Sequence, residues 1–244
     1  MKTLIIIPSR LSAIRLPGKP LLKINGISII SHVFKKATEA NIGEVYVATE
    51  DQEIIDDVKY NGGQAILTGK NHKTGTDRIY EAFEKINNSD IELVINLQGD
   101  EPLINIEDIR NLHNLMIISK ASLGTLASNI EDENLYKKES AVKVMTKESF
   151  KKSKFPEAIN FFRKLKSKKE NIYHHIGIYC YQVETLKRFV SLAQSQNEIK
   201  KKLEQIRALD NKMNINVGLA KKPSVGVDTK EDFVAIKKIM EYKT

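Results

Sequence analysis

The sequence has little of what stabilises many secreted domains, because its 244 residues contain one cysteine and no tryptophan. A single thiol cannot form an internal disulfide, which excludes a disulfide-stapled secreted domain and fits the reducing cytoplasm. Cys180 stands among Ile178, Tyr179 and Tyr181, a run typical of a strand. We therefore expect Cys180 to be a buried structural thiol rather than a catalytic one.

A long hydrophobic run is also missing. A membrane-spanning helix needs about 18 apolar residues in succession, and no segment approaches that length. The N-terminal MKTLIIIPSR begins like a signal peptide, but its apolar run stops at Pro8 without a longer apolar core or a small-residue cleavage site. We expect residues 3–8 to form a buried strand, and the protein to be cytoplasmic with no membrane partner.

Aromatic residues are sparse, at 7% of the chain, although the net charge is +8. Binding of single-stranded nucleic acid relies on aromatic side chains set among basic ones. The lysines instead form short clusters at 35–36, 151–154, 164–169 and 200–202. Such clusters are typical of solvated helix faces. We expect no nucleic-acid partner and a basic protein that attracts small anionic substrates.

Strand and helix patterns alternate in the first half of the chain. The apolar runs at 3–8, 44–49 and 92–97 have the length of strands that are buried on both faces. Helical spacing of apolar residues occurs at 29–37, 51–60, 75–86 and 106–118. This alternation predicts a mostly parallel sheet covered by helices on both faces.

After residue 120 the pattern changes to strand-like segments with fewer helices between them. These segments are ASLGTLASNI, SAVKVMT, EAINFFRK and HIGIYCYQV. The later elements are expected to be helices at 184–192 and 198–209, a strand at 213–220 and a last helix that begins at Thr229 with Asp232 in a capping box. We predict one α/β domain over 1–244, in which 120–215 forms a smaller antiparallel or mixed extension.

A basic loop follows the first strand. Arg10, Arg15 and Lys19 lie within it, together with Gly18 and several prolines. The carboxyl ends of parallel strands form the ligand crevice of such sheets, so these cations can converge on a triphosphate. Gly18 is expected to allow close approach of the backbone, and the prolines to stiffen the loop. The Walker pattern is absent, which excludes a P-loop NTPase.

Two aspartates follow other predicted elements. Asp100 comes directly after the strand VINL, in Gln98-Gly99-Asp100, and Asp228 precedes the last helix. Each alone fits a turn or a helix start equally well. As a pair facing a basic loop they are typical magnesium ligands, because Mg²⁺ takes one or two carboxylates together with phosphate oxygens.

A helix start at Thr74-Gly75 offers a further anion site. Backbone N–H groups at a helix N-terminus suit an anion or the polar edge of a base. Arg78 follows within the first turn. Taken alone, this segment is a weak indication of function.

The ordered set RLPGKPL, HKTGTDRI, QGDEP, HIGIYCY, LEQIRAL and GVDTKED resembles the 3-deoxy-manno-octulosonate cytidylyltransferases. The resemblance extends over nearly the whole chain, from IIIPSR to VGVDTKEDF. It implies a Rossmann-like nucleotidyltransferase domain. It also implies transfer of CMP from CTP to the C2 hydroxyl of the acidic sugar 3-deoxy-D-manno-octulosonate (Kdo), for lipopolysaccharide biosynthesis, by a homodimer that uses Mg²⁺.

The resemblance also implies roles for individual residues. The catalytic residues would be Lys19, Asp100 and Asp228, and the two aspartates would bind Mg²⁺. The nucleotide would be bound by Pro8, Ser9, Arg10, Arg15, Lys19, Thr74, Gly75, Arg78 and Gln98. The sugar would be bound by Gln98, Arg163, His175, Tyr179, Tyr181, Glu204 and Gln205. For His175 and the two tyrosines, strict strand alternation gives one shared face, which fits a core layer as well as a pocket wall.

The sequence departs from the family pattern on the sugar side. Phe162 precedes Arg163 where the family usually has serine, and the lysine-rich stretch 164–169 replaces a proline-aromatic-aspartate-arginine motif. His174 stands where many relatives have arginine. The exact sugar therefore stays open between Kdo, 8-amino-Kdo and a sialic-acid type. A non-catalytic CTP-binding regulator is the alternative outside enzymes.

Overall fold

The computed structural model describes residues 1–12, 15–165, 169–223 and 225–242. The chain divides into two compact units. The first-half unit comprises Lys2–Ile106 and Ser224–Thr244, and the second-half unit comprises Met1 and Glu107–Pro223. The extension expected at 120–215 falls within the second-half unit.

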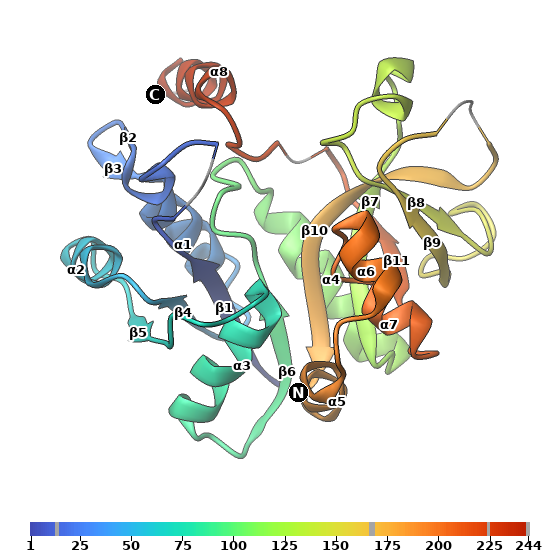
Figure 1. Ribbon diagram of the computed structural model, residues 1–244, viewed down its shortest axis with the longest axis horizontal. Coiled ribbons are helices and arrows are strands. Elements are labelled where there is room, and N and C mark those ends of the chain that lie inside the picture. Colours follow the sequence, from blue (N-terminus) through green and yellow to red (C-terminus); the bar gives the residue numbers. More distant parts are fainter. Residues whose placement is uncertain (13–14, 166–168, 224, 243–244) are drawn as a thin grey trace. The chain divides into compact units, whose positions relative to one another are not determined.

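A parallel sheet forms the centre of the first-half unit (Figure 1). Strand β1 (Lys2–Ser9) lies between β6 (Ile91–Asn96) and β4 (Glu44–Thr49), and β5 (Ala65–Leu67) pairs with the other edge of β4. Parallel neighbours require crossover connections. Helices provide them here, namely α1 (Ile29–Glu39), α2 (Gln52–Tyr60) and α3 (Gly75–Ile86). The first-half unit also contains the short helix η1 (Lys19–Leu21), the hairpin β2 (Lys23–Ile24) and β3 (Ile27–Ser28), and the last helix α8 (Lys230–Glu241).

The local sequence explains where these elements lie and where they begin. The four residues from Leu4 to Ile7 have no solvent exposure, as expected for a strand covered on both faces. Helices α1, α3 and α8 start after Ser28, Thr74 and Thr229, whose hydroxyls each accept a hydrogen bond from a backbone N–H in the first turn. The capping box predicted at Thr229 is present.

The second-half unit contains a mixed sheet. Strand β10 (Ile172–Gln182) runs antiparallel to β7 (Leu123–Ser128) and to β8 (Lys143–Thr146), and β8 runs antiparallel to β9 (Ala158–Phe162). Strand β11 (Asn216–Leu219) is parallel to β7. The helical elements of this unit are α4 (Ile106–Ser119), η2 (Glu133–Tyr136), α5 (Val183–Ser191), α6 (Gln196–Lys201) and α7 (Ile206–Asp210). The predicted fold class, a mostly parallel α/β sheet with an antiparallel or mixed extension, is confirmed.

The single helix expected at 198–209 is wrong, because the chain forms two short helices there. Helix α6 ends at Lys201, and the next residue, Lys202, adopts the left-handed conformation with φ 53°. The break brings Glu198 of α6 against Arg207 of α7, where the guanidinium donates to both carboxylate oxygens at 2.9 and 2.7 Å. Arg207 also lies 4.6 Å from the centre of the Phe189 ring. The buried pair fixes the two helices at an angle that one continuous helix would not allow.

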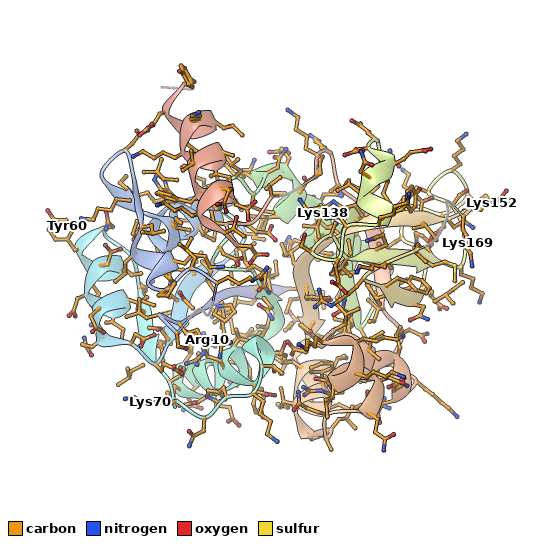
Figure 2. All side chains as sticks on the ribbon, turned by 45° about the horizontal axis from the view of Figure 1, so that its top comes forward. Arg10, Tyr60, Lys70, Lys138, Lys152 and Lys169 are labelled. Atoms are coloured by element: carbon orange, nitrogen blue, oxygen red, sulfur yellow. The ribbon has the colours of Figure 1, made fainter. Side chains whose placement is uncertain are left out.

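The surface lysines are dispersed, as the sequence predicts. Lys138, Lys152 and Lys169 lie on different loops of the second-half unit, and Lys70 lies on a loop of the first-half unit (Figure 2). All of these side chains are exposed. In the part of the chain that is described, no helix combines the length and apolar character needed to cross a membrane.

Replacement of Glu198 by alanine should destabilise the protein strongly. The substitution removes the carboxylate from a buried guanidinium, which typically costs about 3–5 kcal/mol. The free energy of unfolding from urea titration measures this loss. The matched control is Glu184→Ala, which removes an exposed carboxylate that pairs with Lys187, and should cost less than about 1 kcal/mol. Equal losses in the two variants would contradict a structural role for the buried pair.

Candidate active site

A cavity of about 430 Å³ opens where β1 and β6 end, within the first-half unit. This edge of a parallel sheet is the usual position of a ligand crevice. All residues that the sequence analysis assigned to the nucleotide or the metal line it, namely Pro8, Ser9, Arg10, Arg15, Lys19, Thr74, Gly75, Arg78, Gln98, Asp100 and Asp228. The structure therefore brings the basic loop, the acid pair and the start of α3 to one place. Their individual roles stay predictions.

The basic loop is held at both of its ends. The Leu11 N–H donates to Asp51 Oδ2 at 2.7 Å, and Leu11 in turn accepts a hydrogen bond from the Gly18 N–H at 3.2 Å. Gly18 has a φ of 69°, and nothing lies within 4 Å of the position that a side chain would take. No protein group approaches the backbone there, and the expected close approach to a ligand stays a prediction. Glycine is favoured here because the chain turns through the left-handed region before η1.

Lys19 joins the two aspartates. Its Nζ lies 2.6 Å from Asp100 Oδ2 and 3.7 Å from Asp228 Oδ1, and its side chain is 13% exposed. Arg15 reaches the same Asp228 oxygen at 2.8 Å. The segments of the two aspartates are also linked by the backbone, because the Val227 N–H donates to the Asp100 carbonyl at 2.9 Å. The hypothesis that these acids act together has a structural basis in this arrangement.

The acid pair fits a divalent cation that is completed by substrate. Two carboxylates converge on one positive group, the Lys19 ammonium. Among residues 1–12, 15–165, 169–223 and 225–242, no three His, Cys, Asp or Glu side chains form a metal-binding group. The described residues therefore contain no metal site that consists of protein ligands alone. Mg²⁺ characteristically uses one or two carboxylates and takes its other ligands from water and phosphate, so Asp100 and Asp228 suit Mg²⁺ bound together with a nucleotide.

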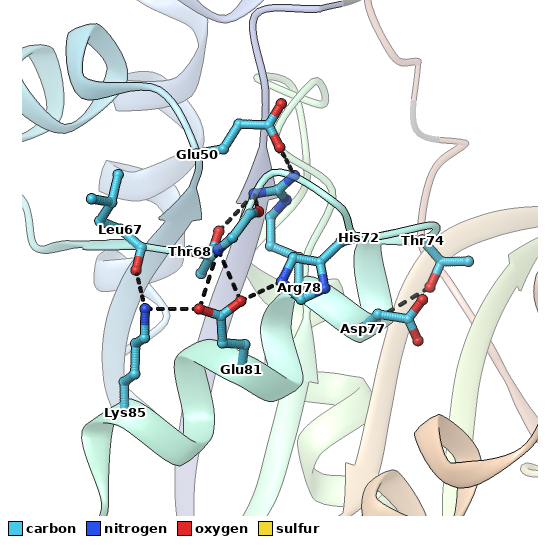
Figure 3. Close-up of polar contacts among 10 residues, drawn as sticks. Glu50, Leu67, Thr68, His72, Thr74, Asp77, Arg78, Glu81 and Lys85 are labelled. Atoms are coloured by element: carbon cyan, nitrogen blue, oxygen red, sulfur yellow. Dashed lines mark hydrogen bonds and ion pairs between the residues drawn. The ribbon is translucent and has the colours of Figure 1, made fainter.

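Arg78 lines the cavity, but its guanidinium is bonded to protein groups. It donates to Thr68 Oγ1 at 2.6 Å and to the Gly69 carbonyl at 3.2 Å, and it pairs with the carboxylate of Glu50 (Figure 3). The side chain is 4% exposed. Since the charge is already paired and buried, the structure indicates that Arg78 orders this wall rather than offering a mobile cation to phosphate.

The aromatic residues that were assigned to the sugar lie in the second-half unit and are buried. The ring of His175 packs between Phe161 and Tyr179, at centroid distances of 5.1 and 5.5 Å, and the Tyr181 ring follows at 6.1 Å from that of Tyr179. His175 Nε2 is hydrogen-bonded to Thr125 Oγ1 at 3.0 Å. Burial lowers the pKa of His175 to about 3, so its ring is neutral at physiological pH. The burial of these rings fits the core layer that strand alternation left open, and their assignment to the sugar stays a prediction.

Arg163 connects the end of β9 to the end of α6. Its guanidinium donates to the carbonyls of Lys201 at 2.8 Å and Lys202 at 2.6 Å. Gln205, three residues beyond Lys202, is buried at the start of α7, and Glu204 precedes it. The assignments of these side chains to the sugar stay predictions. Part of the divergent stretch 164–169 lies outside the described residues.

Comparison with known proteins identifies the family. Residues 4–215 match the sequence profile described as Cytidylyltransferase. A 3-deoxy-manno-octulosonate cytidylyltransferase from Thermodesulfovibrio yellowstonii is 43% identical to this chain, with 98% of each chain covered. The chain belongs to the 3-deoxy-manno-octulosonate cytidylyltransferase family. The enzyme of the same description from Haemophilus influenzae is 38% identical, over 98% of this chain and 99% of its own.

A solved structure supports the same identification. The structure of CMP:2-keto-3-deoxy-manno-octonic acid synthetase in complex with CTP matches with a TM-score of 0.89 and 32% identity, and covers 100% of both chains. The family and the nucleotidyltransferase class predicted from the sequence are therefore confirmed.

Three acids of this cytidylyltransferase were missed by the sequence analysis. Glu50 pairs with Arg78, Asp51 holds the start of the basic loop, and Glu81 binds the loop before α3. Glu50 and Asp51 follow β4 directly and lie at the same sheet edge as the cavity. Their position after a strand is a sequence signal for a ligand site, because strand carboxyl ends form the ligand crevice. Glu81 lies three residues after Arg78 on α3, a spacing that places both on one helix face.

Glu81 should make the stability of the protein sensitive to acid. Partial burial opposes its ionisation, but hydrogen bonds from Lys85, the Gly69 N–H and His72 lower its pKa from 4.5 to about 2. A carboxyl with a lowered pKa in the folded state contributes stability above its unfolded pKa, and this contribution is lost as pH falls from 4.5 towards 2. Urea unfolding across this range should show a steeper loss for the wild type than for Glu81→Gln. Parallel pH profiles would refute this assignment.

Proposed function

We propose that the protein transfers CMP from CTP to the C2 hydroxyl of Kdo, giving CMP-Kdo and pyrophosphate. The observation that carries this proposal is the Lys19 ammonium between Asp100 and Asp228, in the cavity at the end of β1. The relatives of about 40% identity that are named 3-deoxy-manno-octulosonate cytidylyltransferase support Kdo as the acceptor. CTP as the donor is supported by the CTP complex of the structural relative.

The residues of the cavity suit an in-line transfer at phosphorus. The C2 oxygen of the sugar would form a bond to the α-phosphorus of CTP, and the hydroxyl proton would pass to water. The bond from that phosphorus to its bridging oxygen would break, and pyrophosphate would leave with the electron pair. Such a reaction depends mainly on positioning and on charge stabilisation. Arg10, Arg15 and Lys19 supply positive charge for the triphosphate, and Lys19 would exchange its carboxylate contacts for phosphate contacts.

Mg²⁺ is part of the proposal, with Asp100 and Asp228 as its protein ligands. When bound, the metal would neutralise charge on the α-phosphate and lower the pKa of the attacking hydroxyl. The protein prepares this site by fixing Asp100 at the end of β6 and Asp228 at the start of α8. The Asp228 N–H donates to the Asp232 carboxylate at 3.1 Å, so the turn that carries Asp228 is anchored by the helix cap.

Further parts of the proposal concern the cell and the assembly. CMP-Kdo would serve lipopolysaccharide biosynthesis, and the protein would work in the cytoplasm as a homodimer formed through its second half. The family resemblance motivates these points. Gel filtration with light scattering tests the dimer directly.

Pyrophosphate release should be observed with CTP and Kdo and should be lost in Asp100→Ala. Purified protein would be assayed with Kdo, 8-amino-Kdo and N-acetylneuraminate, and with ATP, GTP and UTP in place of CTP. The control variant is Asp56→Ala, since Asp56 is exposed on α2 and does not line the cavity. Turnover only with another sugar acid would assign a different acceptor. CTP binding without turnover for any sugar would favour the regulator.

Removal of divalent cations should abolish turnover, and Mg²⁺ should restore it. Asp228→Asn should raise the Mg²⁺ concentration needed for half-maximal rate about tenfold or more, because one of two charged ligands becomes neutral. Glu231→Gln is the control, since Glu231 is exposed one turn away at the start of α8. Full activity of the chelated enzyme, or the same metal dependence in both variants, would rule out this metal site.

A further inference from the structure

The loop between β5 and α3 forms one wall of the cavity without regular secondary structure. Residues 69–73 belong to no helix or strand, yet His72 and Lys73, with Thr74 at the start of α3, line the cavity. A segment without ladder hydrogen bonds relies on side chains to fix its backbone. The side chains that bond to this loop therefore decide the shape of the wall.

Glu81 of α3 is the main bonding partner of this loop. Its two carboxylate oxygens accept from the Gly69 N–H at 3.1 and 2.9 Å, and Oε2 is hydrogen-bonded to the His72 ring (Figure 3). Lys85, one turn further along α3, pairs with Glu81 at 2.7 Å and donates to the Leu67 carbonyl at 2.7 Å. One carboxylate thus ties both ends of the segment from Gly69 to His72 to a rigid helix.

The backbone at Gly69 is shaped to admit this carboxylate. A methyl group at Gly69 would lie 3.3 Å from Glu81 Oε2 and 3.7 Å from His72 Nε2. The first distance is tight for a carbon against an oxygen, so a side chain there would require the carboxylate to shift slightly. The Glu81 carboxylate therefore lies close against the backbone of Gly69, where the absence of a side chain leaves room for it.

Glu81 and its neighbour Arg78 bond to different parts of the loop. Arg78 bonds to Thr68 and Gly69, at the start of the loop. Glu81 extends to His72, which itself lines the cavity. Neither Glu81 nor Gly69 is among the lining residues, so both act on the cavity through the loop.

We infer that Glu81 is a positioning residue for the nucleotide, which holds the Gly69–His72 segment so that His72, Lys73 and Thr74 face the bound CTP. This inference rests on the proposed nucleotide-binding function of the cavity. Glu81 supports groups that would meet CTP both before and during transfer. The loss of Glu81 should weaken the binding of CTP equally in the ground state and in the transition state. Such a change raises KM for CTP and leaves kcat unchanged.

Glu81→Ala tests the inference against Glu84→Ala, which removes an exposed glutamate from the same helix at equal helix propensity. KM for CTP should rise about tenfold in Glu81→Ala, with kcat within about twofold of the wild type and KM for Kdo unchanged. Glu81→Gln retains the length of the side chain and one acceptor, so its KM should fall between those of Glu81→Ala and the wild type. Calorimetry with CTP should give the same order of Kd.

A double-mutant cycle separates positioning from general destabilisation. Gly69→Ala should also raise KM for CTP, and the double variant Gly69→Ala/Glu81→Ala should be little worse than either single one, because both changes break one contact. If Glu81→Ala does not fold, Glu81→Gln and Gly69→Ala are judged by the same criterion. Lower thermal stability without a change in KM would overturn the inference, as would a KM that shifts equally in Glu84→Ala.

The two proposals fail in different ways. A wild-type protein that binds CTP but leaves Kdo unchanged would contradict the transfer reaction, while the ratio of CTP Kd values between wild type and Glu81→Ala would still test the role of Glu81. Unchanged Kd in Glu81→Ala, with an active wild type, would overturn only the positioning role. A wild type that does not bind CTP would overturn both.

Discussion

The contact on which the site depends is the one between the Lys19 ammonium and the carboxylates of Asp100 and Asp228. It links the basic loop after β1, the turn after β6 and the start of α8, three segments that are far apart in the sequence. Without a cation between them, two carboxylates in a partly buried site would repel each other. Lys19 therefore both assembles the apo site and holds a charge that phosphate groups can later share.

Other buried cations of the protein have a structural use. Arg78 and Arg207 each pair with a glutamate in an almost solvent-free position.

Lys143 has no solvent exposure, and its ammonium donates to the carbonyls of Lys138, Ala141 and Arg163. Burial lowers the pKa of Lys143 to about 8, which shows the cost of keeping this charge in the interior. These cations hold loops together, whereas Arg10 and Arg15 remain exposed at the cavity. The buried cations of the chain thus stabilise its structure, whereas the exposed arginines at the cavity are available to a ligand.

Charged side chains of α3 also hold the cavity wall that is formed by the loop before this helix. Thr74 and Gly75 start α3 at the cavity, and Arg78 and Glu81 extend from the next turn of that helix to bind the preceding loop. A rigid helix therefore fixes an irregular segment, which is how side chains are usually held for binding. The nucleotide wall would owe its shape to Arg78, which lines the cavity, and to Glu81, which does not.

The sequence by itself determined the class of fold, the starts of most elements and most of the residues at the cavity. Apolar periodicity, capping residues and the rule that strand carboxyl ends form the crevice depend on short stretches of chain, and these can be read locally. Tertiary structure alone decided the partners of the charged groups. Nothing near Arg78 points to Glu50, nothing near Arg163 points to the carbonyls of Lys201 and Lys202, and a periodic pattern could not show the break at Lys202 that brings Glu198 to Arg207. Ion pairs and buried hydrogen bonds form between segments that meet only when the chain is folded, so their identity is a property of the packed structure.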